Sequence, residues 1–141
     1  MDNSRVVIDA SFLLKILLPE DNSEKAEELW RSWIKDSIKV VAPTLIIFEV
    51  SSVLRNKIYR GILENDDARE LINQIKHLDL ILIYDEDILN SAWEIGEILK
   101  PSVLYDCFYI ALSKFLDIPL WTADTKLYNS AKGEFPFIKV I

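Results

Sequence analysis

The stretch Arg5-Val6-Val7-Ile8-Asp9 places an acidic residue directly after a short run of apolar residues. The continuous apolar character of this run predicts a strand that is buried on both faces, as in a parallel sheet. A carboxylate that leaves water has to be paired, hydrogen-bonded or bound to a metal. The start of the chain therefore predicts a parallel sheet with a polar site at the end of its first strand.

Three further acidic residues lie beside apolar runs in the same way. Glu49 lies among apolar neighbours inside a predicted helix, Asp106 opens the apolar stretch 107–112, and Asp124 follows the stretch 119–123. Carboxylates that are spread along a chain and gathered in one fold are typical ligands of hard cations such as Mg²⁺. Together with the acid after the first strand, these residues predict a cation site.

Short apolar strands alternate with helices along the rest of the chain. The predicted strands are 5–8, 39–42, 80–83, 119–122 and 137–141. The predicted helices are 11–18, one from Asn22-Ser23, 44–60, one from Asn65 or Asp66, 85–99, 106–116 and 124–131. This alternation predicts an α/β fold of three layers, with a central parallel sheet of about five strands and helices on both faces. Because ligands gather at the carboxyl ends of such strands, all four acids can point to one rim.

Composition excludes several classes of protein. A chain of 141 residues with 50% hydrophobic residues is expected to be one folded domain, 1–141, with a real core. No apolar stretch is long enough for a membrane span, and the N-terminus leads straight into a strand, so we expect a cytoplasmic protein without a signal peptide. Cys107 and His77 are the only cysteine and histidine, which excludes an intrachain zinc site of the Cys/His type.

The net charge of −7 argues against broad, unspecific binding to nucleic acid. It leaves room for a local basic rim around an acidic centre filled by a metal. An acidic surface is equally consistent with a basic partner protein.

Four stretches together resemble the PIN-domain nucleases, and more narrowly the VapC-type toxins of toxin–antitoxin pairs. They are Val7-Ile8-Asp9-Ala10-Ser11, Phe48-Glu49-Val50-Ser51-Ser52-Val53-Leu54, Tyr105-Asp106-Cys107-Phe108-Tyr109-Ile110-Ala111-Leu112 and Leu120-Trp121-Thr122-Ala123-Asp124. Each motif alone is weak, but their order, spacing and predicted context cover nearly the whole chain. The resemblance implies a PIN-like domain, a metal-dependent endoribonuclease, a VapB-type antitoxin whose tail covers the acidic site, and a homodimer.

The resemblance also implies which residues act. Asp9, Glu49, Asp106 and Asp124 match the family's acidic site, and Ser11 and Thr122 match its hydroxyl positions. We expect Asp9 and Asp106 to ligate Mg²⁺ or Mn²⁺ directly, Glu49 to bind directly or through water and to accept a proton, and Asp124 to complete a second metal position. Such ions supply a nucleophile at neutral pH and stabilise charge on phosphate oxygens.

Structural roles compete with these functional interpretations. Asp9, Asp106 and Asp124 are also suited to capping helices, whereas Glu49 inside a helix could pair with a basic residue. Basic side chains near the acids are candidates for phosphate contacts, with Arg55 first because it shares a helix with Glu49. The others are Lys15, Lys57, Arg60, Lys114 and Lys126, and each is individually better explained by a solvated helix face.

Other residues are expected to be structural. Cys107 is expected to pack in the core, and His77 to interact with the end of its helix. The four tryptophans are expected to lie mostly in the core: Trp30, Trp33, Trp93 and Trp121.

Two other functions remain open from the sequence. A metal-stabilised module could bind RNA or a partner without cutting it. An aspartate-based phosphotransferase would also place an Asp after a strand, but the haloacid-dehalogenase pattern needs a second acid where Ser11 stands. Receiver domains need an acidic pair before the phosphoacceptor, and only Asp2 precedes Asp9.

Overall fold

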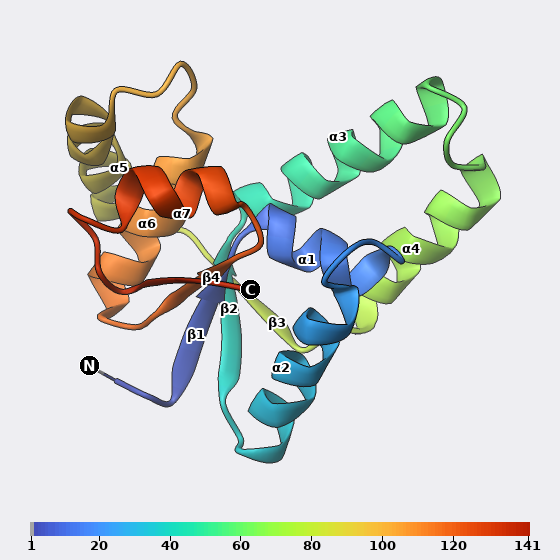
Figure 1. The fold of residues 1–141 in the computed structure, drawn as a ribbon, viewed down its shortest axis with the longest axis horizontal. Helices are drawn as coiled ribbons and strands as arrows, with labels where there is room; N and C mark the ends of the chain where they lie inside the picture. The colour runs from blue at the N-terminus through green and yellow to red at the C-terminus, as the bar shows by residue number, and fades with distance from the viewer. Residues whose placement is uncertain (1) are drawn as a thin grey trace.

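The short apolar runs form one five-stranded sheet in the computed structural model, which describes residues 2–141. The strands are β1 (Arg5–Ile8), β2 (Lys39–Pro43), β3 (Leu80–Ile83), β4 (Leu120–Thr122) and β5 (Ile138–Val140). All neighbouring pairs are parallel, in the order β3-β2-β1-β4-β5 (Figure 1). The predicted strands and the parallel sheet are confirmed, with boundaries that differ by a residue or two.

Helices fill the connections between the strands. They are α1 (Ala10–Leu17), α2 (Ser23–Lys35), α3 (Leu45–Tyr59), α4 (Asn65–His77), α5 (Glu86–Leu99), α6 (Tyr105–Leu116) and α7 (Thr125–Ala131). The crossovers from β1 to β2 and from β3 to β4 run in opposite directions along the sheet. Because parallel crossovers are right-handed, α1 and α2 cover one face while α5 and α6 cover the other. This is the three-layer arrangement that the sequence predicts.

The strand order creates a switch point beside β1. The chain leaves β1 toward β2 on one side and later returns to place β4 on the other side, where Val7 pairs with Leu120 and Ile8 with Trp121. Helices depart from neighbouring strands in opposite directions at such a point and leave a crevice at the carboxyl ends. The carboxyl ends of β1 and β4 are therefore the expected place for a ligand.

A continuous core holds the layers together. Phe12 of α1 is fully buried, and its ring stacks on Trp33 of α2 with 5.4 Å between the ring centroids. Trp30 and Trp33 are buried, and Cys107 has no exposed surface, as expected. The prediction for Trp93 is wrong, because 64% of this side chain is exposed on the outer side of α5. Helical spacing alone did not show that α5 lies at the edge of the molecule.

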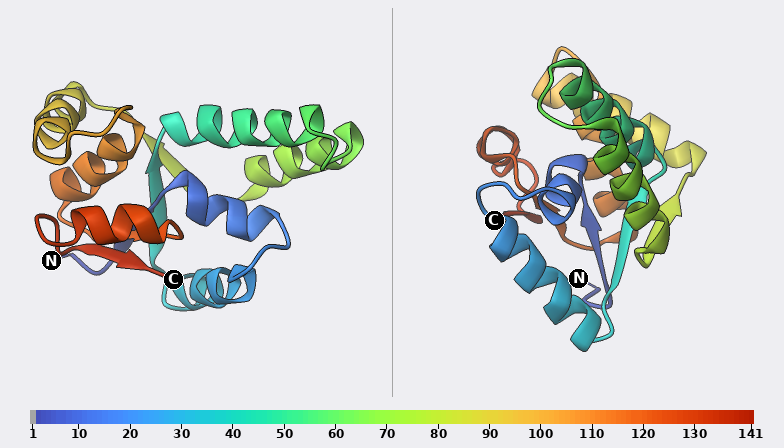
Figure 2. Two further views of the ribbon diagram at one scale, coloured as in Figure 1. Left: turned by 45° about the horizontal axis from the view of Figure 1, so that its top comes forward. Right: turned by 90° about the vertical axis from the view of Figure 1, so that its right-hand side faces the viewer.

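Helices α3 and α4 run side by side away from the sheet and form a projecting hairpin (Figures 1 and 2). Gly61 ends α3 with a φ of +73°, a left-handed conformation that glycine adopts without strain. The hairpin thus extends beyond the sheet while the first turns of α3 stay beside the carboxyl end of β2.

Thr44 and Asn22 stand directly before α3 and α2 and are of residue types that often cap helices, but neither side chain forms a cap. Thr44 already has helical backbone angles, with φ −53° and ψ −27°, and its side chain does not cap α3. Asn22 is left-handed and does not cap α2 either; instead the Ser23 hydroxyl donates to the carbonyl of Leu18. A capping side chain requires an extended backbone at the cap residue, and neither residue has one.

Within residues 2–141, no helix combines the length and the apolar character that crossing a membrane would require.

Replacing Phe12 by alanine should lower the free energy of unfolding by about 3–5 kcal/mol, because it removes a fully buried ring and leaves a cavity against Trp33. Phe115→Ala is the control, since Phe115 is 48% exposed on α6, and it should cost less than about 1 kcal/mol. Urea denaturation measures both values. Equal losses for the two variants would contradict the packing described for α1 and α2.

Candidate active site

Asp9 follows β1 at the switch point and is almost completely buried, with 3% of its surface exposed. Its Oδ1 accepts hydrogen bonds from the Ser11 hydroxyl (2.7 Å) and from the backbone N–H of Phe12 (2.9 Å). Its Oδ2 accepts a hydrogen bond from the hydroxyl of Thr122, the last residue of β4. Asp9 therefore caps α1 and also ties together the two strands that flank the crevice.

The hydroxyls of Ser11 and Thr122 extend this network to the loop after β4. Their oxygens lie 3.1 Å apart. The Ser11 hydroxyl accepts from the N–H of Ala123 at 3.0 Å, and the Thr122 hydroxyl accepts from the N–H of Asp124 at 3.0 Å. Both residues thus orient the carboxylate of Asp9 and fix the backbone that carries Asp124.

Burial raises the pKa of Asp9 to about 6, against hydrogen bonds from Thr122, Ser11 and the Phe12 N–H that act in the opposite direction. The charge of Asp106 adds to the increase. Removal from water outweighs several hydrogen bonds to the carboxylate. A positive charge that binds beside Asp9 would therefore stabilise the charged form of this carboxylate.

Asp106 lies in the first turn of α6 and does not cap this helix, whose cap residue is Leu104. Within residues 2–141, its carboxylate takes part in no side-chain hydrogen bond or ion pair. Burial, followed by the charge of Asp124, raises its pKa. The helix-cap interpretation is thus wrong for Asp106, and both of its oxygens are free to bind a ligand.

Glu49 lies in the second turn of α3, half-buried, and is held by Tyr109 of α6. The Tyr109 hydroxyl donates to Oε1 of Glu49 at 2.7 Å, and Tyr109 itself is only 1% exposed. Burial raises the pKa of Glu49, the hydrogen bond from Tyr109 lowers it, and the charge of Asp106 raises it. Burial and the charge of Glu49 raise the pKa of Tyr109, so the phenol stays protonated and donates.

Asp124 caps α7, because its Oδ1 accepts from the N–H groups of Lys126 (3.0 Å) and Leu127 (3.1 Å). The cap interpretation is therefore correct for Asp124, as it is for Asp9. Capping leaves Asp124 available for a role in the site, because both bonds use Oδ1 and neither uses the second oxygen, Oδ2.

Asp106 is at the centre of the four acids. Its charge raises the pKa of both Asp9 and Glu49, and the charge of Asp124 raises its own. Among residues 2–141, no three acidic, cysteine or histidine side chains are already placed to hold a metal ion together. The donors are carboxylate oxygens, which are the ligands that suit Mg²⁺ and Mn²⁺. The residues thus fit a divalent cation.

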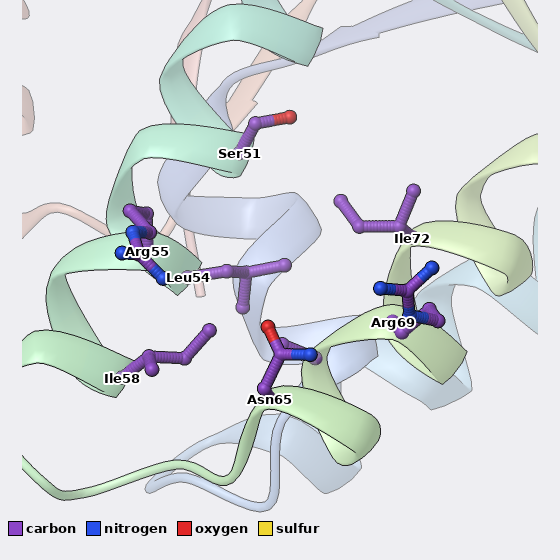
Figure 3. A pocket seen from close by; sticks show the side chains of 8 residues that line it. Ser51, Leu54, Arg55, Ile58, Asn65, Arg69 and Ile72 are labelled. Atoms are coloured by element: carbon purple, nitrogen blue, oxygen red, sulfur yellow. The ribbon is translucent and has the colours of Figure 1, made fainter.

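The basic residues are distributed around the acids unequally. Lys126 lies two residues after Asp124, in the first turn of α7, whereas Lys15 lies 3.8 Å from Glu20 in an ion pair. Arg55 is exposed and lines a cavity of about 250 Å³ between α3 and α4, opposite Arg69, as Figure 3 shows. Arg55 thus faces the groove of the projecting hairpin, six residues and about 9 Å along the helix axis from Glu49.

Tyr109 is a functional candidate that the sequence did not single out. A tyrosine in the middle of an apolar helix is expected to pack in the core, and Tyr109 is indeed buried. The available signal was its spacing, because Tyr109 follows Asp106 by one helical turn and so lies on the same side of α6.

Comparison with known proteins places this geometry in a family. The model of the PIN domain matches residues 6–133. The ribonuclease VapC3 of Pyrobaculum aerophilum is 26% identical over 126 residues, which cover 87% of this chain and 92% of that protein. The structure of VapC20 from Mycobacterium tuberculosis, a toxin that cleaves the sarcin–ricin loop, superposes with a TM-score of 0.67 at 15% identity and covers 92% of this chain and 95% of that one. A toxin–antitoxin complex from Klebsiella pneumoniae gives a TM-score of 0.64 at 14% identity, with 95% of each chain covered.

The metal-free protein should lose stability as the pH rises. The folded pKa of Asp9, about 6, lies above its ordinary value of 3.8, so the folded state holds the proton more tightly. The contribution of Asp9 is complete below pH 3.8 and is lost as the pH rises through about 6, a total loss of about 3 kcal/mol. Asp9→Asn should abolish this part of the pH dependence in urea titrations with EDTA. The exposed Asp117→Asn is the control, and an Asp9→Asn profile that matches wild type would contradict the burial of an unpaired charge.

Removing the phenol of Tyr109 should raise the pKa of Glu49 further. The hydrogen bond from Tyr109 favours the charged carboxylate, and Tyr109→Phe removes it while retaining the buried ring. An NMR titration of the Glu49 carboxyl carbon measures the change. The control is Tyr59→Phe, an exposed tyrosine at the far end of α3. A pKa that stays the same or falls in Tyr109→Phe would show that the hydrogen bond is not formed in solution.

Proposed function

The chain belongs to the PIN-domain family, and from this premise we propose that it is a metal-dependent endoribonuclease that acts as the toxin of a toxin–antitoxin pair. The observation that supports this most strongly is the free, half-buried carboxylate of Asp106 at the centre of Asp9, Glu49 and Asp124. Ribonuclease activity is the function named for relatives such as VapC3. The substrate class proposed for this chain is therefore RNA.

The proposed cofactor is Mg²⁺ or Mn²⁺. Asp106 and Asp9 would be its direct ligands, Glu49 would bind directly or through water, and Asp124 would complete a second position through its free oxygen. When bound, the cation lowers the pKa of a water molecule and stabilises negative charge on the phosphate. Binding of the cation is favoured because its charge offsets the cost of burying the carboxylates and reduces their mutual repulsion.

The protein residues provide orientation and a proton acceptor. Ser11 and Thr122 hold the carboxylate of Asp9 in one orientation, and Tyr109 does the same for Glu49. A carboxylate with a raised pKa accepts a proton more readily near neutral pH, so Glu49 is the proposed general base for the attacking water. Lys126 of α7 and Arg55 of α3 are the proposed phosphate contacts.

The proposed partner is a VapB-type antitoxin whose tail covers the acidic site. The groove between α3 and α4 offers it an apolar floor with Leu54 and Ile72, flanked by Arg55 and Arg69. Within residues 2–141, neither arginine forms an ion pair. A segment with apolar and acidic side chains would satisfy both features. The solved Klebsiella pneumoniae relative is itself a toxin–antitoxin complex.

A homodimer is proposed as the assembly. Leu89 and Trp93 lie one turn apart on α5 and are 46% and 64% exposed, and Val103 in the following loop is 60% exposed. An exposed group of apolar side chains more often marks a surface that contacts a partner than a surface that stays in water. The proposed site of action is the cytoplasm, where a single buried thiol such as Cys107 stays reduced.

Cleavage of a mixed RNA pool should require Mn²⁺ or Mg²⁺, stop with EDTA, and fall by at least about 100-fold in Asp106→Asn. The fold should be retained, because the substitution removes a repulsive charge without removing a hydrogen bond. The matched control is Asp117→Asn at the other end of α6, where asparagine tolerates the left-handed backbone. This control should cut at the wild-type rate.

Equal cleavage by Asp106→Asn and wild type would contradict the proposed site. Wild-type protein that binds Mn²⁺ and RNA without cutting would instead support a non-cleaving binding module.

A further inference from the structure

An aromatic pocket lies beside the four acids and has no place in the chemistry described above. It has a volume of about 270 Å³, and its rings come from Phe48, Tyr84, Tyr105 and Phe108. Phe48, Tyr84 and Tyr105 are 68%, 66% and 52% exposed. Four aromatic side chains from three segments of the chain thus form one concave and accessible surface.

The pocket and the acids share the same two helices. Phe48 precedes Glu49 on α3, and Tyr105 precedes Asp106 on α6. Neighbouring residues on a helix point about 100° apart, so each helix presents an acid to the crevice and a ring to the pocket. The pocket lies at the carboxyl ends of β2 and β3, next to β1, whose end carries Asp9.

We propose that this pocket holds one unstacked base of the RNA, next to the phosphate that is cut. The inference rests on the proposed ribonuclease function and extends it to substrate recognition. RNA that is read in single-stranded form is commonly bound by stacking its bases on aromatic side chains. A base that adjoins the reacting phosphate has to lie close to Glu49 and Asp106, and the pocket begins at their neighbours.

The chemistry of the lining suits a neutral planar ring with polar edges. Among residues 2–141, no charged side chain lines the pocket. Thr44, Tyr84 and Tyr105 are among the lining residues, and within residues 2–141 none of their hydroxyls takes part in an intramolecular hydrogen bond. Stacking provides affinity for any base, while these free hydroxyls can distinguish one base edge from another.

The size of the pocket favours a base over a second protein chain. Nine residues line it, whereas a stable protein interface uses roughly 20–30 residues on each side. Its volume of about 270 Å³ lies just below the range of roughly 300–1,000 Å³ that is common for small-molecule sites. A single ring system is therefore the occupant that fits.

The first experiment maps the cut ends of a mixed RNA pool by sequencing, for wild type, Phe48→Ala and Phe48→Tyr. Wild type should prefer a particular base at one position beside the cut. Phe48→Ala should cut roughly 5- to 100-fold more slowly, with a flattened preference, because it loses stacking on one ring. Phe48→Tyr should retain the preference, and so should Tyr59→Ala, which removes an even more exposed ring at the far end of α3.

The second experiment measures binding without cleavage, in the Asp106→Asn background with EDTA. Fluorescence anisotropy compares a short single-stranded RNA with copies that carry one abasic sugar at each position in turn. One abasic position should weaken binding roughly 5- to 100-fold, and adding Phe48→Ala should remove this difference. This pattern supports the pocket even if wild type cuts no RNA, in which case only the proposed catalysis fails.

Two results would overturn the inference. One is unchanged discrimination between intact and abasic RNA in Phe48→Ala. The other is light scattering that shows a wild-type dimer and a Phe48→Ala monomer, together with an unchanged base preference. That result would assign the pocket to contact between two copies of the chain.

Discussion

The burial of the Asp9 carboxylate is the constraint on which the rest of the site depends. Asp9 ends the central strand of a parallel sheet, at the point where the chain reverses direction and β4 returns beside β1. Hydroxyls from both sides of the crevice and a backbone N–H satisfy its oxygens. Because burial still raises its pKa to about 6, the network stabilises the geometry of the carboxylate without removing the cost of its charge.

This residual cost links stability to function. Three of the four acids have raised pKa values, and the charge of Asp106 or Asp124 contributes to each increase. A protein selected only for stability would gain from neutral residues at these positions. Retaining carboxylates that repel one another is understandable if a cation offsets the repulsion and carries out chemistry there. Helix capping by Asp9 and Asp124 then fixes the positions of these two carboxylates. Capping does not account for the presence of four acids that repel one another.

The strands, the parallel sheet and the set of acids could be predicted from sequence, because apolar runs and isolated charges are local signals. The order of the strands could not be predicted, because the sequences of short parallel strands do not indicate which strands pair. The switch point between β1 and β4 follows from that order and was therefore not predicted either. The exposure of Trp93 and the bond from Tyr109 to Glu49 depend on how α5 and α6 pack. The side chains of Asn22 and Thr44 do not cap their helices, because the backbone at neither residue is extended.

The most direct test of a cation site at the switch point is anomalous X-ray diffraction from crystals soaked in Mn²⁺. We predict a peak within about 2.0–2.6 Å of an Asp106 oxygen and of an oxygen from Asp9 or Glu49. The same peak should be absent from crystals of Asp106→Asn. A fully occupied Mn²⁺ elsewhere on the surface, with no peak between these carboxylates, would contradict the assignment of this crevice as the metal centre.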